Sequence, residues 1–170
     1  MVKGLTKTSE TIAIGFSVDE SAANTYTQGS VDLNLDPLNN EVFVVLAINL
    51  DPFPASAIAG TDTRVRAALT TTSKTGMPGL SDNNCLATST NQIQAQGFVD
   101  GGVGFQQTSL DTPPATLDYL GIIATNDFFV QVQGDNNAVA KGVNGKLYGY
   151  RAKASASIYA ALVQSEVLSA

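Results

Sequence analysis

The amino-acid sequence predicts an all-β protein, a single antiparallel jelly-roll or β-sandwich domain of about eight strands. Apolar residues alternate with polar residues over several short segments, which is the period-two pattern of strands with one buried face. Turn-forming Gly, Pro, Asn and Asp separate these segments at short intervals. The sequence shows neither a long amphipathic helical pattern nor a repeat of solenoid or propeller length, so two packed sheets are expected.

The strongest strand patterns lie in the first third of the chain. Residues 11–19 alternate cleanly between apolar and polar positions. Residues 41–51 are apolar at successive positions, which predicts a central strand covered on both faces, and their β-branched content favours a strand over a helix. Further strands are expected at residues 30–36, 64–72, 92–99, 117–124 and 127–134.

The last part of the chain has two interpretations. After Lys146 the even-numbered positions from Tyr148 to Leu162 are apolar, which predicts one long final strand or two joined strands. A short helix over residues 158–167 is the alternative. Tyr148 and Tyr150 share one face of the predicted strand, and we expect them to pack in the core.

The chain length and the absence of a linker predict one folding unit. A chain of 170 residues is typical of a single domain and can bury a sizeable core, and no linker divides it. We expect residues 1–10 to form a flexible N-terminal segment and residues 11–170 to form the sandwich. Between residues 73 and 89, Gly, Pro, Asn and Ser predict a long loop.

The charge content favours assembly over nucleic-acid binding. Only 14% of residues are charged, well below the usual quarter, and the net charge is −6. A polar surface with few charges loses little hydration energy when a neighbour covers it. The acidic balance and the lack of a basic cluster predict no direct contact with nucleic acid.

Cellular placement is predicted from what the sequence lacks. The N-terminus has no apolar signal-peptide region, and no apolar run is long enough to span a membrane. We therefore expect the protein to fold in the compartment where it is made. The single cysteine, Cys85, excludes an internal disulfide and is expected to be a small core residue.

Catalytic and cofactor sites are not expected. The chain has no histidine, which excludes Ser–His–Asp and Cys–His nucleophiles and His-bearing zinc sites. The remaining carboxylates lie mostly in predicted turns, where Asp is favoured by its bonds to the backbone. We predict that the protein is not an enzyme and binds no cofactor, and the weak candidates for a cation site are Asp82, Asn84, Asp135 and Asn137.

The chain resembles the single jelly-roll capsid proteins of icosahedral viruses. The resemblance lies in chain size, strand number, the lack of a signal peptide and the closing block GKLYGYRAKASASIYAAL, residues 145–162, which is similar to a long final strand of that fold. It implies a structural virion protein whose two four-stranded sheets form the wall of a shell or sit on its surface. Its partners would be copies of itself and other virion proteins.

Three other functions fit parts of the sequence. A decoration or cement protein on a tailed-phage head would sit on another shell. A secreted filament subunit of the donor-strand type would donate residues 6–18 to a neighbour's sheet, although no export signal is present. A carbohydrate-binding or hydrolytic β-sandwich is a third alternative, against which the absence of His and Trp argues.

Subunit contacts are expected in three segments without regular partners of their own, because a neighbour often orders such loops. The segments are the N-terminal stretch 2–8, the Pro-rich loop 52–59 and the long loop 73–84. The candidate contact residues are Val2, Leu5, Pro52, Phe53, Pro54, Met77 and Pro78.

Overall fold

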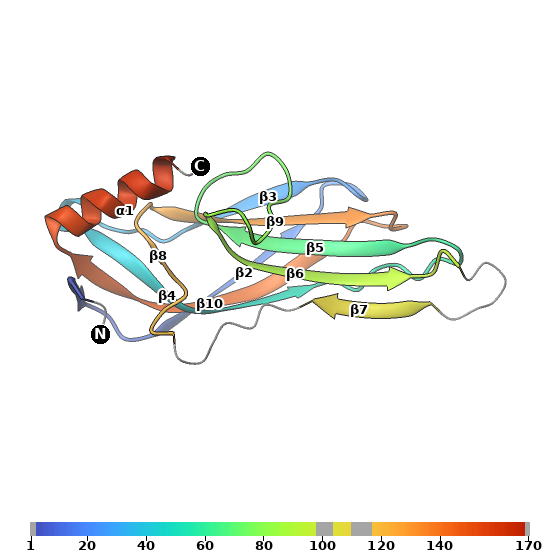
Figure 1. Cartoon of the computed structure of the whole chain (residues 1–170), viewed down its shortest axis with the longest axis horizontal. Coiled ribbons are helices and arrows are strands. Elements are labelled where there is room, and N and C mark those ends of the chain that lie inside the picture. The colour runs from blue at the N-terminus through green and yellow to red at the C-terminus, as the bar shows by residue number, and fades with distance from the viewer. Residues whose placement is uncertain (1–2, 98–103, 110–116, 169–170) are drawn as a thin grey trace.

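The fold was analysed in a computed structural model, which describes residues 3–97, 104–109 and 117–168 (Figure 1). Ten strands, a short 3-10 helix and one α-helix are present in this part of the chain. They are β1 (Leu5–Lys7), β2 (Ile12–Asp19), β3 (Thr27–Asp32), η1 (Pro37–Asn39), β4 (Glu41–Pro52), β5 (Thr63–Thr70), β6 (Cys85–Gln94), β7 (Phe105–Ser109), β8 (Gly121–Ile123), β9 (Asp127–Asp135), β10 (Gly142–Ala154) and α1 (Ala156–Leu168).

Two antiparallel sheets form a sandwich, which confirms the predicted all-β class. Sheet A contains β10 at its centre, with β4 and then β8 on one side and both β1 and β2 along the other side. Sheet B has the order β3-β9-β5-β6-β7. Every pairing in both sheets is antiparallel.

The connectivity is that of a jelly roll. Apart from the extra strands β1 and β7, the chain runs through β2, β3, β4, β5, β6, β8, β9 and β10. In this series the outermost strands pair first and the innermost last: β2 pairs with β10, β3 with β9, β4 with β8, and β5 with β6. The resulting long hairpin is rolled up, because β10 also pairs with β4 and β9 also pairs with β5.

The main core fills the space between the sheets. The alternation predicted over residues 11–19 is confirmed, because Ile14, Phe16 and Val18 of β2 pack against this core. The rings of Phe16 and Phe128 meet edge to face, with centroids 5.7 Å apart.

Strand β4 is covered on both faces, as its sequence predicts. Phe43 and Val45 point into the core between the sheets. Val42 and Val44 point to the outer face of sheet A, where they belong to a second apolar cluster that includes residues of α1. The uninterrupted apolar run therefore reflects two separate cores.

The long final strand was a wrong prediction, and the helical alternative is correct. Strand β10 ends at Ala154, and α1 begins at Ala156 directly after Ser155, whose carbonyl accepts from the amide of Tyr159 at 2.9 Å. Serine is favoured immediately before a helix. The residues that pack against the sheet have the i, i+1, i+4, i+5 spacing of one helical face: they are Ile158, Tyr159, Leu162 and Val163.

Other boundaries also differ from the prediction. The first seven residues of β6 lie at positions 85–91, partly inside the predicted loop. The Ser, Thr and Asn side chains at 88–91 give no apolar alternation by which a strand could be predicted. Strand β7 was not predicted, and part of the strand expected at 92–99 lies outside the described residues. Cys85 is half-buried rather than a core residue, and its thiol lies 3.5 Å from the carbonyl of Ala87.

The N-terminal segment forms part of the domain. Residues 5–7, expected to be flexible, form β1 and pair with residues 152–154 of β10. Leu5 is buried in the apolar cluster of the outer face of sheet A, which fixes the strand. Strands β1 and β2 together occupy the edge of sheet A in their own subunit. The donor-strand alternative would instead place residues 6–18 in the sheet of a neighbouring subunit.

Candidate interaction surfaces

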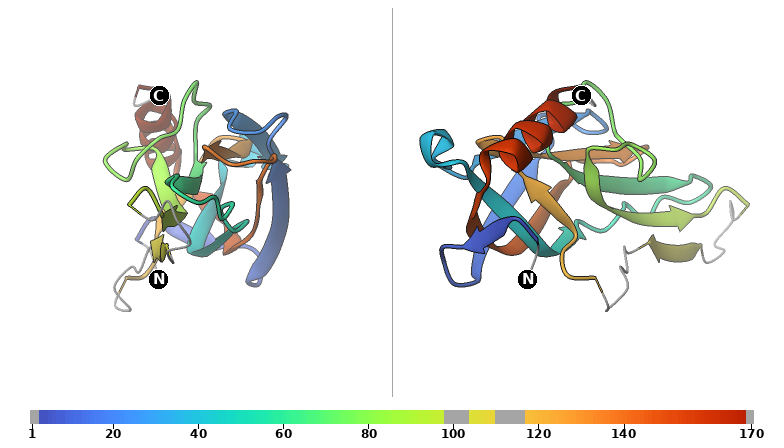
Figure 2. Two further views of the ribbon diagram at one scale, coloured as in Figure 1. Left: turned by 90° about the vertical axis from the view of Figure 1, so that its right-hand side faces the viewer. Right: turned by 60° about the vertical axis from the view of Figure 1, so that its left-hand side comes forward.

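Helix α1 covers one half of the outer face of sheet A (Figure 2). Ile158, Tyr159, Leu162 and Val163 of the helix pack on an apolar surface made by β1, β4, β8 and β10. Burial of that surface is nondirectional and needs no specific partners. The residues of the sheet that form it are Leu5, Val42, Val44, Leu46, Ile122, Tyr150, Ala152 and Ala154.

One buried carboxylate anchors the end of α1. The Glu166 side chain accepts hydrogen bonds from the backbone amides of Ala124 at 2.8 Å and Thr125 at 3.2 Å, in the turn between β8 and β9. Burial raises the pKa of Glu166 above its ordinary value, and the two amide bonds offset part of that rise. The carboxylate therefore ties the helix to the turn.

The exposed face of α1 carries no charge. Glu166 is the helix's one charged residue, and it is buried. A surface helix normally presents charged side chains to water. The exposed residues here are instead Ala156, Ser157, Ala160, Ala161, Gln164, Ser165, Val167 and Leu168.

An exposed leucine and an apolar pocket lie beside this helix. Leu38 is 93% exposed at the tip of η1. The Asp36 carboxylate fixes that turn, because it accepts from the amide of Leu38 at 3.0 Å and from the Asn39 side chain. A pocket of about 420 Å³ lies next to η1, and its lining includes Pro37, Tyr159 and Val163.

The outer face of sheet B is covered differently, by the loop of residues 71–84 between β5 and β6 (Figure 1). Gln131 of β9 points to this outer face, yet it is fully buried. Its amide nitrogen donates to Thr70 Oγ1 at 2.7 Å and to Gln28 Oε1 at 3.0 Å. The side chain is thus buried among polar groups rather than apolar ones.

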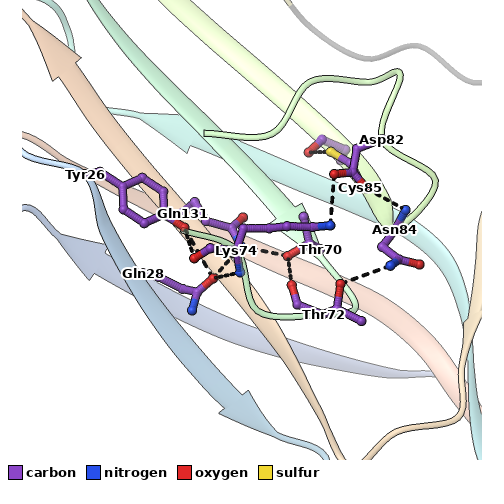
Figure 3. Close-up of polar contacts among 10 residues, drawn as sticks. Tyr26, Gln28, Thr70, Thr72, Lys74, Asp82, Asn84, Cys85 and Gln131 are labelled. Atoms are coloured by element: carbon purple, nitrogen blue, oxygen red, sulfur yellow. Dashed lines mark hydrogen bonds and ion pairs between the residues drawn. The ribbon is translucent and has the colours of Figure 1, made fainter. Parts of the chain in front are cut away.

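The loop is bonded to the sheet through the same polar groups (Figure 3). The backbone amide of Lys74 donates to Gln28 Oε1 at 2.8 Å, and the Tyr26 hydroxyl donates to the carbonyl of Lys74 at 2.8 Å. Partial burial raises the pKa of the Tyr26 hydroxyl, which keeps it a donor. These bonds satisfy groups that the loop would otherwise leave unpaired.

An ion pair closes the loop on itself, and it involves two of the predicted cation ligands. Asp82 lies 2.9 Å from Lys74 Nζ and also accepts from the amide of Asn84 at 3.0 Å. The Asn84 amide bond and the lysine lower the pKa of Asp82. The Asn84 side chain donates to Thr72 Oγ1 at 3.0 Å, so both candidates have structural partners in the loop.

The other two predicted cation ligands lie at the opposite end of the sandwich. Asp135 forms ion pairs with Arg64 and Arg66. The Asn137 side chain accepts from the amide of Ser56 at 2.9 Å and donates to the carbonyl of Arg64 at 2.9 Å. Across the described ranges, no three acidic or thiol side chains are grouped as a metal ion would require.

A pocket of about 290 Å³ near Asp135 also contains Asp62. Two carboxylates in one groove would suit a hydrolase, but both are engaged in bonds within the protein. Asp62 accepts from the amides of Ala95 and Gln96 at 2.8 and 2.9 Å, and Asp135 holds its arginines. Their present role is to fix loops and strands.

The predicted subunit-contact residues have mixed positions. Leu5 and Pro52 are buried inside strands of their own subunit, whereas Phe53 and Pro54 are exposed. Met77 and Pro78 are half-buried in the loop that covers sheet B. Val2 lies outside the described residues.

The surface features described above were not identified from the sequence. The uncharged exposed face of α1 could not be predicted, because the sequence pattern predicted a strand where the helix lies. Leu38 sits between turn residues, and a single leucine there gave no strand or helix signal. Gln131 alternates with core residues like any solvent-facing residue, so its burial depends on the loop above it.

Within the described residues, no helix has the length and apolar character needed to cross a membrane. No protein-family model, curated protein or solved structure matched the sequence or the fold of this chain. Its function is therefore argued from the fold and the surfaces alone.

Proposed function

We propose that this chain is a structural virion protein that assembles with copies of itself into, or onto, an icosahedral capsid shell. The jelly-roll connectivity supports this proposal, because viral capsid domains are among the proteins built on it. The same fold also serves lectins and cupins, so the fold alone does not carry the argument. The surface of α1 does.

The observation that carries the proposal is the uncharged exposed face of α1. A chain with a net charge of −6 repels its own copies, and contact is least unfavourable where neither surface is charged. Small side chains such as Ala160 and Ala161 allow close approach and lose little hydration when covered. We infer that α1 contacts a neighbouring copy.

The surroundings of α1 support the same interface. Leu38 projects from a fixed turn, and the apolar pocket next to Pro37 is a hollow in the same region. A projection and a hollow on one surface suit contacts between copies of one chain.

A charge inserted on α1 tests the proposal. Ala161→Glu places a carboxylate on the exposed face of the helix, and Val139→Glu is the matched control. Val139 is 58% exposed in the turn between β9 and β10, at the opposite end of the molecule from α1 (Figure 1). Assembly is measured by sedimentation velocity and negative-stain microscopy over a range of protein concentrations.

We expect the wild type and Val139→Glu to form closed particles. Ala161→Glu should need at least about tenfold more protein to assemble, which corresponds to a contact weakened by about 1.4 kcal/mol or more. A discrete trimer would indicate a decoration protein instead, and a fibre would indicate a filament subunit. A wild type that stays a monomer at every concentration would contradict the proposal. Equal assembly by both variants would remove α1 from the interface.

A further inference from the structure

The outer face of sheet A changes character along β10. The half next to α1 is apolar and covered, and it includes Tyr150 and Ala152. The other half, from Asn144 to Tyr148, has polar side chains, and α1 does not reach it. A β-bulge between Tyr148 and Gly149 marks the boundary. Bulges re-aim side chains and are frequent next to binding sites.

Five side chains of this uncovered half line one depression of about 300 Å³. Two cross-strand pairs form most of it, because Asn144 lies opposite Asp51 and Lys146 lies opposite Asn49. Tyr148, half-buried, forms its border on the side of the bulge. The set comes from the centre of the sheet, on two long strands that hold it in place.

None of these five side chains has a hydrogen-bond or ion-pair partner within the described ranges 3–97, 104–109 and 117–168. In contrast, the polar groups on the outer face of sheet B bond to each other, as Gln131 does to Thr70 and Gln92 does to Gln107. The donors and acceptors of the depression are therefore available to a ligand.

The neighbouring strand β2 leaves the depression open. Gly15 lies opposite Lys146, and no atom comes within 4 Å of the place where a Cβ would stand. The next residues on the same face, Ala13 and Ser17, are small and exposed. A ligand can thus approach across β2 without moving a side chain.

We propose that this depression binds a neutral sugar unit of a glycan. Sugar hydroxyls both donate and accept, and they match two amides, one carboxylate and one ammonium group. The charges of Asp51 and Lys146 cancel, which disfavours a phosphate or a lone cation. The ring of Tyr148 offers an apolar surface for the C–H face of a pyranose. The volume is at the lower limit for small-molecule pockets and suits one monosaccharide.

Saturation-transfer difference NMR tests the proposal on monomers and on large particles alike, so its result does not depend on the assembly proposal. The probes are methyl β-galactoside, methyl α-mannoside, N-acetylglucosamine and, as a charged comparator, N-acetylneuraminic acid. Asn49→Ala and Lys146→Ala remove exposed side chains without partners, so both variants should fold. Gln107→Ala, which removes an exposed polar side chain from the edge strand β7 of sheet B, is the control for a change away from the depression.

We expect saturation of at least one neutral sugar by the wild type and by Gln107→Ala, and a loss of at least about tenfold in affinity in Asn49→Ala and Lys146→Ala. Tyr148→Phe should retain most binding and Tyr148→Ala should lose it. The proposal is overturned if no neutral sugar binds, if only the acidic sugar binds, or if the Asn49 and Lys146 variants bind like the wild type.

Discussion

The outer faces of the two sheets are each covered in part by another segment of the chain, but by opposite chemistry. Val44 on sheet A and Gln131 on sheet B are each fully buried on the outer side of their sheet. Val44 is covered by apolar residues of α1. Gln131 instead hydrogen-bonds to Gln28 of β3 and to Thr70 at the end of β5, and the covering loop bonds in turn to Gln28 through the amide of Lys74.

The difference has a physical consequence. Apolar burial is nondirectional, so the cover of sheet A depends on shape and area. A buried amide stabilises its surroundings only while its partners remain in place, so the cover of sheet B depends on individual bonds. Four experiments test this comparison.

The largest effect is expected from a charge placed under α1. Val44→Asp buries a carboxylate with no partner and should lower the free energy of unfolding by more than about 3 kcal/mol. Thr90→Asp on the outer face of sheet B lies opposite Arg66 and should change it by less than about 0.5 kcal/mol. Urea unfolding followed by circular dichroism measures both. Equal losses would mean that the two faces do not differ.

Loss of the buried amide should have the next largest effect. Gln131→Leu leaves Thr70 Oγ1 without its donor and should cost about 1–3 kcal/mol. The loop should also open more often, so trypsin should cleave after Lys74 faster than in the wild type. Gln107→Leu, at an exposed position, is the control. A variant as stable as the wild type would show that the polar bonds are dispensable.

The anchor of α1 should respond to pH. Because burial raises the pKa of Glu166 above its ordinary 4.5, its contribution to stability is complete below that value and is lost as the pH rises through the folded-state pKa. Each unit of the rise corresponds to about 1.4 kcal/mol. Thermal unfolding from pH 4 to 7 should show this loss in the wild type and not in Glu166→Gln. Parallel curves for the two proteins would contradict the assignment.

Loss of the Lys74–Asp82 ion pair in the β5–β6 loop should have the smallest effect and the opposite pH dependence. Its partners are partly exposed, so Lys74→Ala should cost at most about 1 kcal/mol. The pKa of Asp82 is lowered from 3.8, so its contribution is present above that value and is lost as the pH falls through the lower folded-state pKa. Acid-dependent proteolysis of the loop measures this change. A wild-type loop that stays protected from proteolysis at low pH would show that the Lys74–Asp82 ion pair does not hold the loop closed.

Sequence periodicity determined the β class and the strands that carry the core. The alternation over residues 11–19 and the apolar run over residues 41–51 appear in the structure as the sequence predicts. These patterns are local, because side chains alternate between the two faces of any strand. They report that a face is buried, and they do not report what buries it.

Tertiary structure decided what covers each face. In β10 the even positions Tyr150, Ala152 and Ala154 lie under α1, while Asn144 and Lys146 are polar and exposed. The core between the sheets receives the odd positions Val143 and Leu147. After Ala154 the apolar even positions through Leu162 fit a strand, whereas Tyr159 and Val163 complete the spacing of a helical face. Contact of that face with the outer side of sheet A favours the helix. Polar burial is determined in the same way, since Gln131 finds its partners, Gln28 and Thr70, on strands that lie far from it in the sequence.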